Sequence, residues 1–323
     1  MNFRILLRFL VFLSAFAPLR AAAAPHVFFL IGEDEYDTRT TLPAFAKAEL
    51  DPRGVRSTIS ILPEGGTEFP NFEALKDADL LLISVRRKTP PKAQLDAIRA
   101  HIVAGKPVIG IRTASHAFAL RGKKDEKPPV VPAGLADWPE FDHEILGGNY
   151  TDHYGKGIET LAKIVPGQEQ HPVLAGMGAE EFKVPSHLYK NPNLPAWVTP
   201  LLTARMTGRP EVEPIAWVNT KDQRRVFYTS LGSVEDFAVP QFRKLLLNGI
   251  FWALAQPVPA AKATALRPGQ TNAPGLSPKE GAQALTVADD LIFEQVLAEP
   301  DVVNTTEPPA PWATICFTAS CAV

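Results

Sequence analysis

Cysteine is almost absent from this sequence of 323 residues. The two cysteines, Cys316 and Cys321, both lie near the C-terminal end, and no Cys-x-x-Cys-His motif occurs. The main part of the chain therefore has neither a disulfide framework nor a thiol nucleophile, and c-type haem attachment is excluded.

An excess of either charge is also lacking. The formal net charge is −2, the isoelectric point is about 6.4, and the densest basic cluster is only the three residues Arg86–Lys88. Without a basic stripe we expect no nucleic acid partner. A hydrophobic share of 46% is typical of a globular protein, and the length predicts one large domain with an appendage.

Residues 1–24 have the pattern of a signal peptide. Arg4 and Arg8 precede an apolar run, residues 9–19, and alanines at 21–24 offer a cleavage site. The apolar stretch is broken by Pro18 and Arg20 and is too short to cross a bilayer comfortably. We expect an exported protein, periplasmic or secreted, with no membrane association beyond the signal peptide.

Apolar runs alternate with amphipathic segments from residue 25 to residue 255. This alternation predicts an α/β domain with a doubly wound, mostly parallel sheet and helices on both faces, of the flavodoxin-like kind. A Pro/Ala-rich linker (256–284) and a disordered C-terminal tail (within 285–323) are expected to follow. The predicted strands are Val27–Ile31, Val55–Leu62, Leu80–Val85, Val108–Ile111, Glu159–Ile164, Pro214–Val218 and Arg225–Thr229, and the predicted helices are Leu42–Leu50, Phe72–Lys76, Lys92–Val103 and Pro240–Ala255.

The stretch PVIGIRTASHAF, residues 107–118, contains the strongest candidate site. Its apolar run reads as a buried parallel strand and passes directly into polar residues. Ligands of open α/β sheets collect beyond the carboxyl ends of the strands. The candidate residues at this strand end are therefore Arg112, Thr113, Ser115 and His116.

Two further segments are rich in polar groups. Residues 141–157 hold histidines, acids and glycines, and residues 228–236 follow a later strand in the same way that Arg112 follows its own. The candidates from these segments are Asn149, Asp152, His153, Tyr154, Tyr228 and Asp236.

Four segments together resemble the ThuA-like (trehalose utilisation) family, whose fold is that of class I glutamine amidotransferases. They are VIGIRTASHAF, LGGNYTDHYGKG, EPIAWVN and RVFYTSLGSVEDF with the following FRKLLLNGIFWAL, and the resemblance covers about residues 25–255. The resemblance implies a protein that acts on a carbohydrate or a keto-sugar derivative.

The sequence departs from the amidotransferase pattern at the nucleophile. Those enzymes present a cysteine on a sharp elbow, whereas here Gly110 and Ile111 are followed by Arg112. Arginine stays protonated and cannot attack, so glutamine hydrolysis through a thioester is excluded. Many relatives also have a histidine where this chain has Ser233.

We therefore expect acid/base chemistry without a cysteine nucleophile, by a hydrolase, lyase or isomerase. His116 and His153 would exchange protons, Arg112 would clamp the substrate, and Asp236 would orient His116 or begin the last helix. Two structural alternatives remain: Arg112 in an ion pair with the Glu33–Glu35 turn, and His116 bonded to a loop carbonyl. The predicted sugar-binding residues are Thr113, Ser115, Asn149, Asp152, Tyr154 and Tyr228.

Two other functions stay open at this point. One is a non-catalytic module that binds sugar or docks a fused dehydrogenase, and the other is a metal-dependent hydrolase with His143 and His153 as ligands. Apart from such a divalent metal we expect no cofactor, and homo-oligomer formation is left open.

The segment LTVADDLIFEQVLAEPDVV (285–303) resembles the opening of large periplasmic dehydrogenase-like propeller proteins, which occur fused behind ThuA-like domains. The following PPAPWATICFTASCAV departs from that pattern. Residues 285–323 are therefore predicted to be a truncated or frame-shifted remnant of a second domain.

Overall fold

A computed structural model of the chain describes residues 23–120 and 129–259, together with two short strands, β12 (Leu291–Gln295) and β13 (Phe317–Cys321), which pair antiparallel. Most of the predicted signal peptide, linker and C-terminal remnant lies outside the described residues. Among the helices that are described, none is long and apolar enough to cross a membrane.

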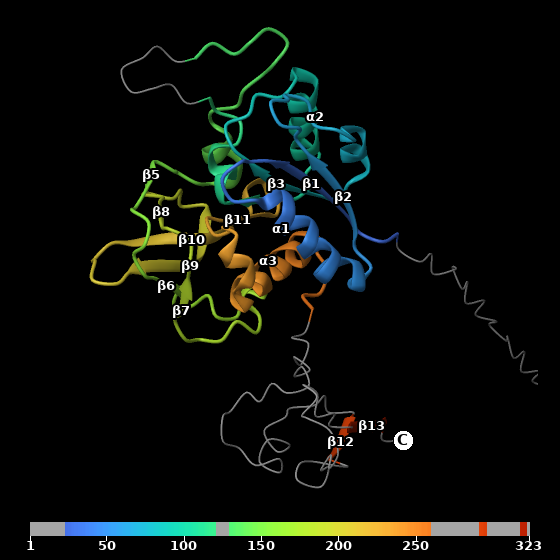
Figure 1. Ribbon diagram of the computed structural model, residues 1–323, viewed down its shortest axis with the longest axis vertical. Coiled ribbons are helices and arrows are strands. Elements are labelled where there is room, and N and C mark those ends of the chain that lie inside the picture. Colours follow the sequence, from blue (N-terminus) through green and yellow to red (C-terminus); the bar gives the residue numbers. More distant parts are fainter. Residues whose placement is uncertain (1–22, 121–128, 260–290, 296–316, 322–323) are drawn as a thin grey trace, which may run out of the picture.

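A nine-stranded sheet forms the centre of the domain (Figure 1). Five neighbouring strands are parallel, and four antiparallel strands extend the sheet on one side. The predicted α/β fold class is confirmed. In sheet order the strands are β2 (Arg56–Ile61), β1 (His26–Gly32), β3 (Leu80–Val85), β4 (Val108–Ile111), β11 (Val226–Thr229), β10 (Val212–Asn219), β9 (Val198–Met206), β6 (Thr160–Ile164) and β7 (Phe182–Val184).

Helices cover both faces of the parallel part of the sheet. Helices α1 (Thr38–Phe45) and α3 (Pro240–Ala253) lie on one face, and α2 (Lys92–Val103) lies on the other. Successive side chains of β1 enter the two resulting cores in turn, because strand residues point alternately to opposite faces. A strand buried on both sides must be apolar throughout, which explains its uninterrupted hydrophobic run.

Short helical turns connect these elements, and a small antiparallel ribbon lies beside the main sheet. The ribbon consists of β5 (Asp152–His153) and β8 (Tyr189–Lys190). The helical turns are η1 (Ala46–Leu50), η2 (Asp51–Arg53), η3 (Phe72–Asp77), η4 (Arg112–His116), η5 (Asp142–Leu146), η6 (Pro172–Leu174), η7 (Lys221–Gln223) and η8 (Glu235–Ala238).

Several predicted elements differ from the structure. The first helix begins at Thr38 rather than at residue 42, and its last turn widens into a π-helix. Val103, the last residue of α2, is apolar but 86% exposed, although it lies next to buried Ile102. Strand β9 was not predicted, because its inward and outward residues do not alternate regularly and its pairing with β10 contains register shifts.

The carboxyl ends of β1, β3, β4 and β11 meet at one edge of the sheet, and the strand order reverses between β1 and β3. Such a switch point is where open α/β sheets bind ligands. Packing directly beneath this edge is tight: a Cβ atom added at Gly110 in β4 would lie 2.9 Å from Leu146 Cδ2 and 3.0 Å from Tyr228 Cδ2.

Candidate functional site

The chain turns sharply at Arg112, immediately after β4. Its φ of 46° lies in the left-handed region, which costs a residue other than glycine roughly 1–3 kcal/mol. The loop after β11 lies close against this turn, since a Cβ atom at Gly232 would be 2.5 Å from Ile111 Cγ2. The strand β4 thus ends in a sharp turn with an arginine at its apex.

The guanidinium of Arg112 points into the protein and is 1% exposed. Its Nη1 donates to the Ser230 carbonyl at 2.7 Å, and its Nη2 lies 3.1 Å from His187 Nδ1 and 3.2 Å from Nε2. The rings of Tyr36 and Tyr189 lie 4.1 and 4.6 Å from its central carbon, within cation–π distance. Arg112 therefore holds strand ends together, and it does not line the cavity described below.

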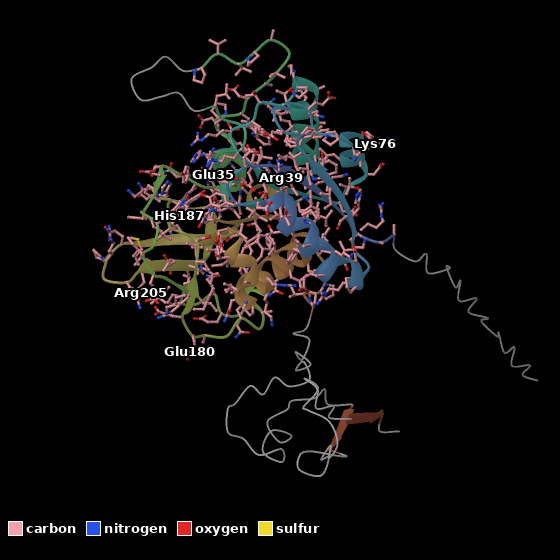
Figure 2. All side chains as sticks on the ribbon, viewed as in Figure 1. Glu35, Arg39, Lys76, Glu180, His187 and Arg205 are labelled. Atoms are coloured by element: carbon pink, nitrogen blue, oxygen red, sulfur yellow. The ribbon has the colours of Figure 1, made fainter. Side chains whose placement is uncertain are left out.

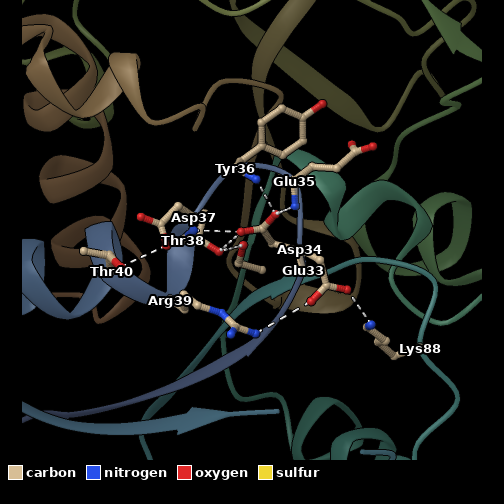
Figure 3. Close-up of polar contacts among 10 residues, drawn as sticks. Glu33, Asp34, Glu35, Tyr36, Asp37, Thr38, Arg39, Thr40 and Lys88 are labelled. Atoms are coloured by element: carbon tan, nitrogen blue, oxygen red, sulfur yellow. Dashed lines mark hydrogen bonds and ion pairs between the residues drawn. The ribbon is translucent and has the colours of Figure 1, made fainter. Parts of the chain in front are cut away.

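The suggested ion pair between Arg112 and the Glu33–Glu35 turn is wrong, because these carboxylates bind elsewhere. Buried Glu33 accepts hydrogen bonds from the amides of Glu35, Tyr36 and Thr38 at 2.7–2.8 Å and from the Thr38 hydroxyl, as Figure 3 shows. Glu35 pairs with Arg86 at 2.9 Å. Glu33 thus folds the loop so that the Tyr36 ring reaches Arg112.

A polar cavity of about 370 Å³ opens at the same edge of the sheet. Of the residues predicted from the sequence, it brings together Ser115, His116, Asn149 and Asp152, with His143 also in its wall. Sequence reasoning did not select three further wall residues, Arg87, Asp142 and Tyr150.

His116 is held from three sides. Its Nδ1 lies 3.1 Å from the Ser115 hydroxyl, and its ring stacks on Tyr150 with centroids 4.7 Å apart and planes at 24°. The Arg87 amide, also in a left-handed conformation, donates to the His116 carbonyl at 3.0 Å. The imidazole is therefore fixed in the wall of the cavity.

Asp142 lies in the cavity wall on η5. One carboxylate oxygen, Oδ2, accepts the Tyr150 amide at 2.9 Å, whereas Oδ1 is buried with no partner among the described residues. Burial raises the pKa of Asp142 to about 7, and the Tyr150 hydrogen bond only partly opposes this. Gly148 is the one sequence signal for this close packing, because a Cβ atom there would lie 2.1 Å from Asp142 Oδ1.

His187 is a site residue that could not be predicted, because the residues around it in the sequence form no recognisable motif. It precedes β8 on the side of the sheet that carries the small ribbon (Figure 2). Burial and the nearby charges of Arg112, His153 and Lys156 lower its pKa to about 4. His187 is thus neutral at pH 7 and can accept a hydrogen bond from Arg112. His153 is exposed, and its ring contacts that of His187 at 4.6 Å, outside the cavity wall.

Asp236 has a different role in the structure from the one predicted. It accepts hydrogen bonds from the amides of Gly232 (2.6 Å), Ser233 (2.9 Å) and Ser186 (3.3 Å) and from the Ser186 hydroxyl. These contacts tie the loop after β11 to the segment before β8. Asp236 also lies in η8, before the last helix begins at Pro240.

The other predicted binding residues face protein rather than the cavity. Tyr154 donates to Glu213 Oε1 at 2.9 Å, and Tyr228 donates to the Arg112 carbonyl at 2.7 Å. Thr113 is completely buried beside the elbow. For these three, the structure indicates packing and positioning.

The two predicted metal ligands lie in different surroundings. His143 lies against Trp197, with ring centroids 6.3 Å apart, while His153 lies against His187. Within the described ranges, no three His, Cys, Asp or Glu side chains are grouped so that they could hold a metal ion.

Replacing Arg112 by Lys is expected to destabilise the fold by about 2–4 kcal/mol, because an ammonium group cannot bond Ser230 and stack on two rings at once. Urea unfolding measures this change, with the exposed Arg39→Lys as the control, for which we expect almost no effect. Wild-type stability in Arg112→Lys would show that the buried guanidinium does not hold the strand ends together.

The raised pKa of Asp142 predicts how stability depends on pH. Between its ordinary value of 3.8 and about 7, the folded chain keeps a proton that the unfolded chain has lost. This group alone therefore lowers the free energy of unfolding by up to roughly 1.4 kcal/mol per pH unit as pH rises through that window. The pKa values of His101 and His187 are lowered from 6.5 to about 4. These two histidines therefore raise the free energy of unfolding as pH rises from about 4 to 6.5.

The effect of Asp142 is isolated by comparing the wild type with Asp142→Asn in urea titrations between pH 4 and 8. We expect the wild type to lose stability relative to the variant as pH rises from 4 to 7. The exposed Asp51→Asn serves as the control, and parallel curves for wild type and Asp142→Asn would contradict the assignment.

Comparison with known proteins places these features in a family. A family model described as ThuA, trehalose utilisation, matches residues 40–253. A ThuA-like protein of Bacteroides uniformis is similar in structure, with a TM-score of 0.53, 19% identity, and coverage of 73% of this chain and 95% of that one. A ThuA-like protein of Parabacteroides merdae is also similar in structure, with a TM-score of 0.51, 16% identity, and coverage of 73% of this chain and 92% of that one. No curated protein sequence matches the chain. Because the family model covers well over half of its length, the chain belongs to the ThuA family.

Proposed function

We propose that this protein binds a carbohydrate, or a keto-sugar derivative, in the polar cavity and acts on it by acid/base chemistry through His116. The observation that supports this most is the placement of a buried, oriented histidine in the wall of a cavity of about 370 Å³ at the ligand-binding edge of the sheet. The family description, trehalose utilisation, agrees with a sugar ligand.

The wall of the cavity suits a ligand rich in hydroxyl groups. Arg87 can donate hydrogen bonds, Asp152 can accept them, and the Asn149 amide group can do both. The ring of Tyr150 adds an apolar surface beside His116. In this proposal Ser115, Asn149 and Asp152 bind the sugar, while Arg112 and Asp236 position the loops from which the cavity is built.

A non-catalytic sugar-binding module is the second candidate. One observation favours it: the position at which amidotransferases carry their nucleophile is occupied by Arg112, whose side chain is buried and bonded to protein. The same experiment separates the two candidates.

The test is a panel of disaccharides and their 3-keto forms, with binding measured by calorimetry and conversion followed by NMR. We expect His116→Asn to lose about 10²–10⁴-fold in turnover while binding changes little, which is typical of a lost acid/base group. His171→Asn is the matched control, because asparagine can replace His171 as the N-cap that accepts the Val173 amide. Undiminished turnover in His116→Asn would refute the proposed role, and wild-type binding without any turnover would identify a binding module.

Export is part of the proposal and is supported by the pattern of residues 1–24. Expressed in a Gram-negative host, the protein should appear in the periplasm with a mass that lacks about the first 24 residues, as intact mass spectrometry would show. A variant without residues 1–24 should stay in the cytoplasm. Full-length protein found only in the cytoplasm would contradict export.

A further inference from the structure

Asp142 is the one carboxylate of the cavity wall that is buried. We propose that it is a second catalytic group, a carboxylic acid that gives a proton to a substrate oxygen while His116 takes a proton from the neighbouring carbon. This inference rests on the proposed function and narrows it: the substrate would be a keto sugar, and the reaction would move the keto group by one carbon.

Tyr150 fixes the acid and the base relative to each other. Its backbone amide donates to Asp142 Oδ2 at 2.9 Å, and its ring stacks on the imidazole of His116 at 4.7 Å. All three residues line the same cavity. One residue of the loop after η5 thus contacts both proton-transfer groups, through its amide on one side and its ring on the other, and holds them in the same cavity wall.

The surroundings of the carboxyl group favour its neutral form. A Cβ atom at position 148 would lie 2.1 Å from Asp142 Oδ1, so only glycine leaves room for the carboxyl group there. Oδ1 itself is buried without a partner among the described residues, which is costly for a carboxylate and favours the protonated acid. The raised pKa, about 7, agrees with this geometry.

The other ionisable groups around Asp142 come from β11, η4, η5 and β5 and from two loops. Tyr228, from β11, lies behind it, and burial raises the pKa of Tyr228 well above its ordinary value, so it stays neutral. The remaining groups share the cavity wall: Arg87, His116, Glu140, His143 and Asp152. Of the influences on the pKa of Asp142, burial is the largest, and the hydrogen bond from the Tyr150 amide opposes it.

An uncharged carboxylic acid and an imidazole that can accept a proton together suit enolisation. His116 takes the proton from the carbon next to the keto group, the C–H electron pair forms a C=C bond, and the carbonyl π electrons move to oxygen, which receives the proton of Asp142. The enediol then returns a hydroxyl proton to the Asp142 carboxylate, and His116 protonates the former carbonyl carbon. Both groups are restored, and no external oxidant or reductant is needed.

The experiment follows proton exchange in D₂O with a 3-keto disaccharide, using NMR to detect deuterium at the carbons flanking the keto group. We expect Asp142→Asn to exchange at least 100-fold more slowly while its affinity stays within a few-fold of the wild type. Because the acid form is required, the wild-type rate should fall as pH rises through about 7, and this alkaline limb should be absent in Asp142→Asn.

Two glycines of the same loop region provide a matched pair. Gly148→Ala displaces the carboxyl group and should slow exchange as Asp142→Asn does, whereas Gly155→Ala should leave it unchanged, since no atom lies within 4 Å of a Cβ atom there. If the wild type binds no sugar, the proposed function fails. If it binds without exchange, or if Asp142→Asn keeps both the rate and the alkaline limb, the inference fails while sugar binding stands.

Discussion

The buried guanidinium of Arg112 is the constraint on which the cavity depends. Its hydrogen bonds go to a carbonyl and an imidazole rather than to a carboxylate, and its faces are covered by tyrosine rings. A buried cation is tolerated only where such partners replace its lost hydration. The ends of β1, β4 and β11 and the segment before β8 must therefore meet around it, and His116 is placed by the same elbow four residues later.

Neutrality of the groups around this cation is the second requirement. Arginine can only donate hydrogen bonds, so His187 must be unprotonated to accept one, and its pKa of about 4 ensures this at neutral pH. On the cavity side, the pKa of Asp142 is displaced in the opposite direction. Tyr189 lies between the two regions, within 4.6 Å of both Arg112 and the Tyr150 ring. The same edge of the sheet thus keeps a histidine neutral beside Arg112 and a carboxyl group protonated up to about neutral pH beside the cavity.

The parallel half of the fold could be predicted from the sequence because its signals are local. β3, β4 and α2 have the predicted boundaries, since continuous apolar runs and helical periodicity depend only on neighbouring residues. The roles of Arg112 and Asp142 could not be predicted in this way. The left-handed turn directs the Arg112 side chain inward, and the environment of Asp142 depends on a glycine six residues away and on a strand more than 80 residues later.

The antiparallel half of the sheet, which the sequence predicted least well, supplies the missing contacts. Glu213 of β10 accepts the Tyr154 hydroxyl with one oxygen and the Asn191 amide with the other, at 2.9 Å each. Both strands of the β5–β8 ribbon are thereby anchored to β10, and the ribbon carries Tyr189 to Arg112. Any change that loosens Glu213 would therefore reach the cavity through Tyr189 and Tyr150. The geometry of the cavity at the parallel edge thus depends on strands of the antiparallel half of the sheet.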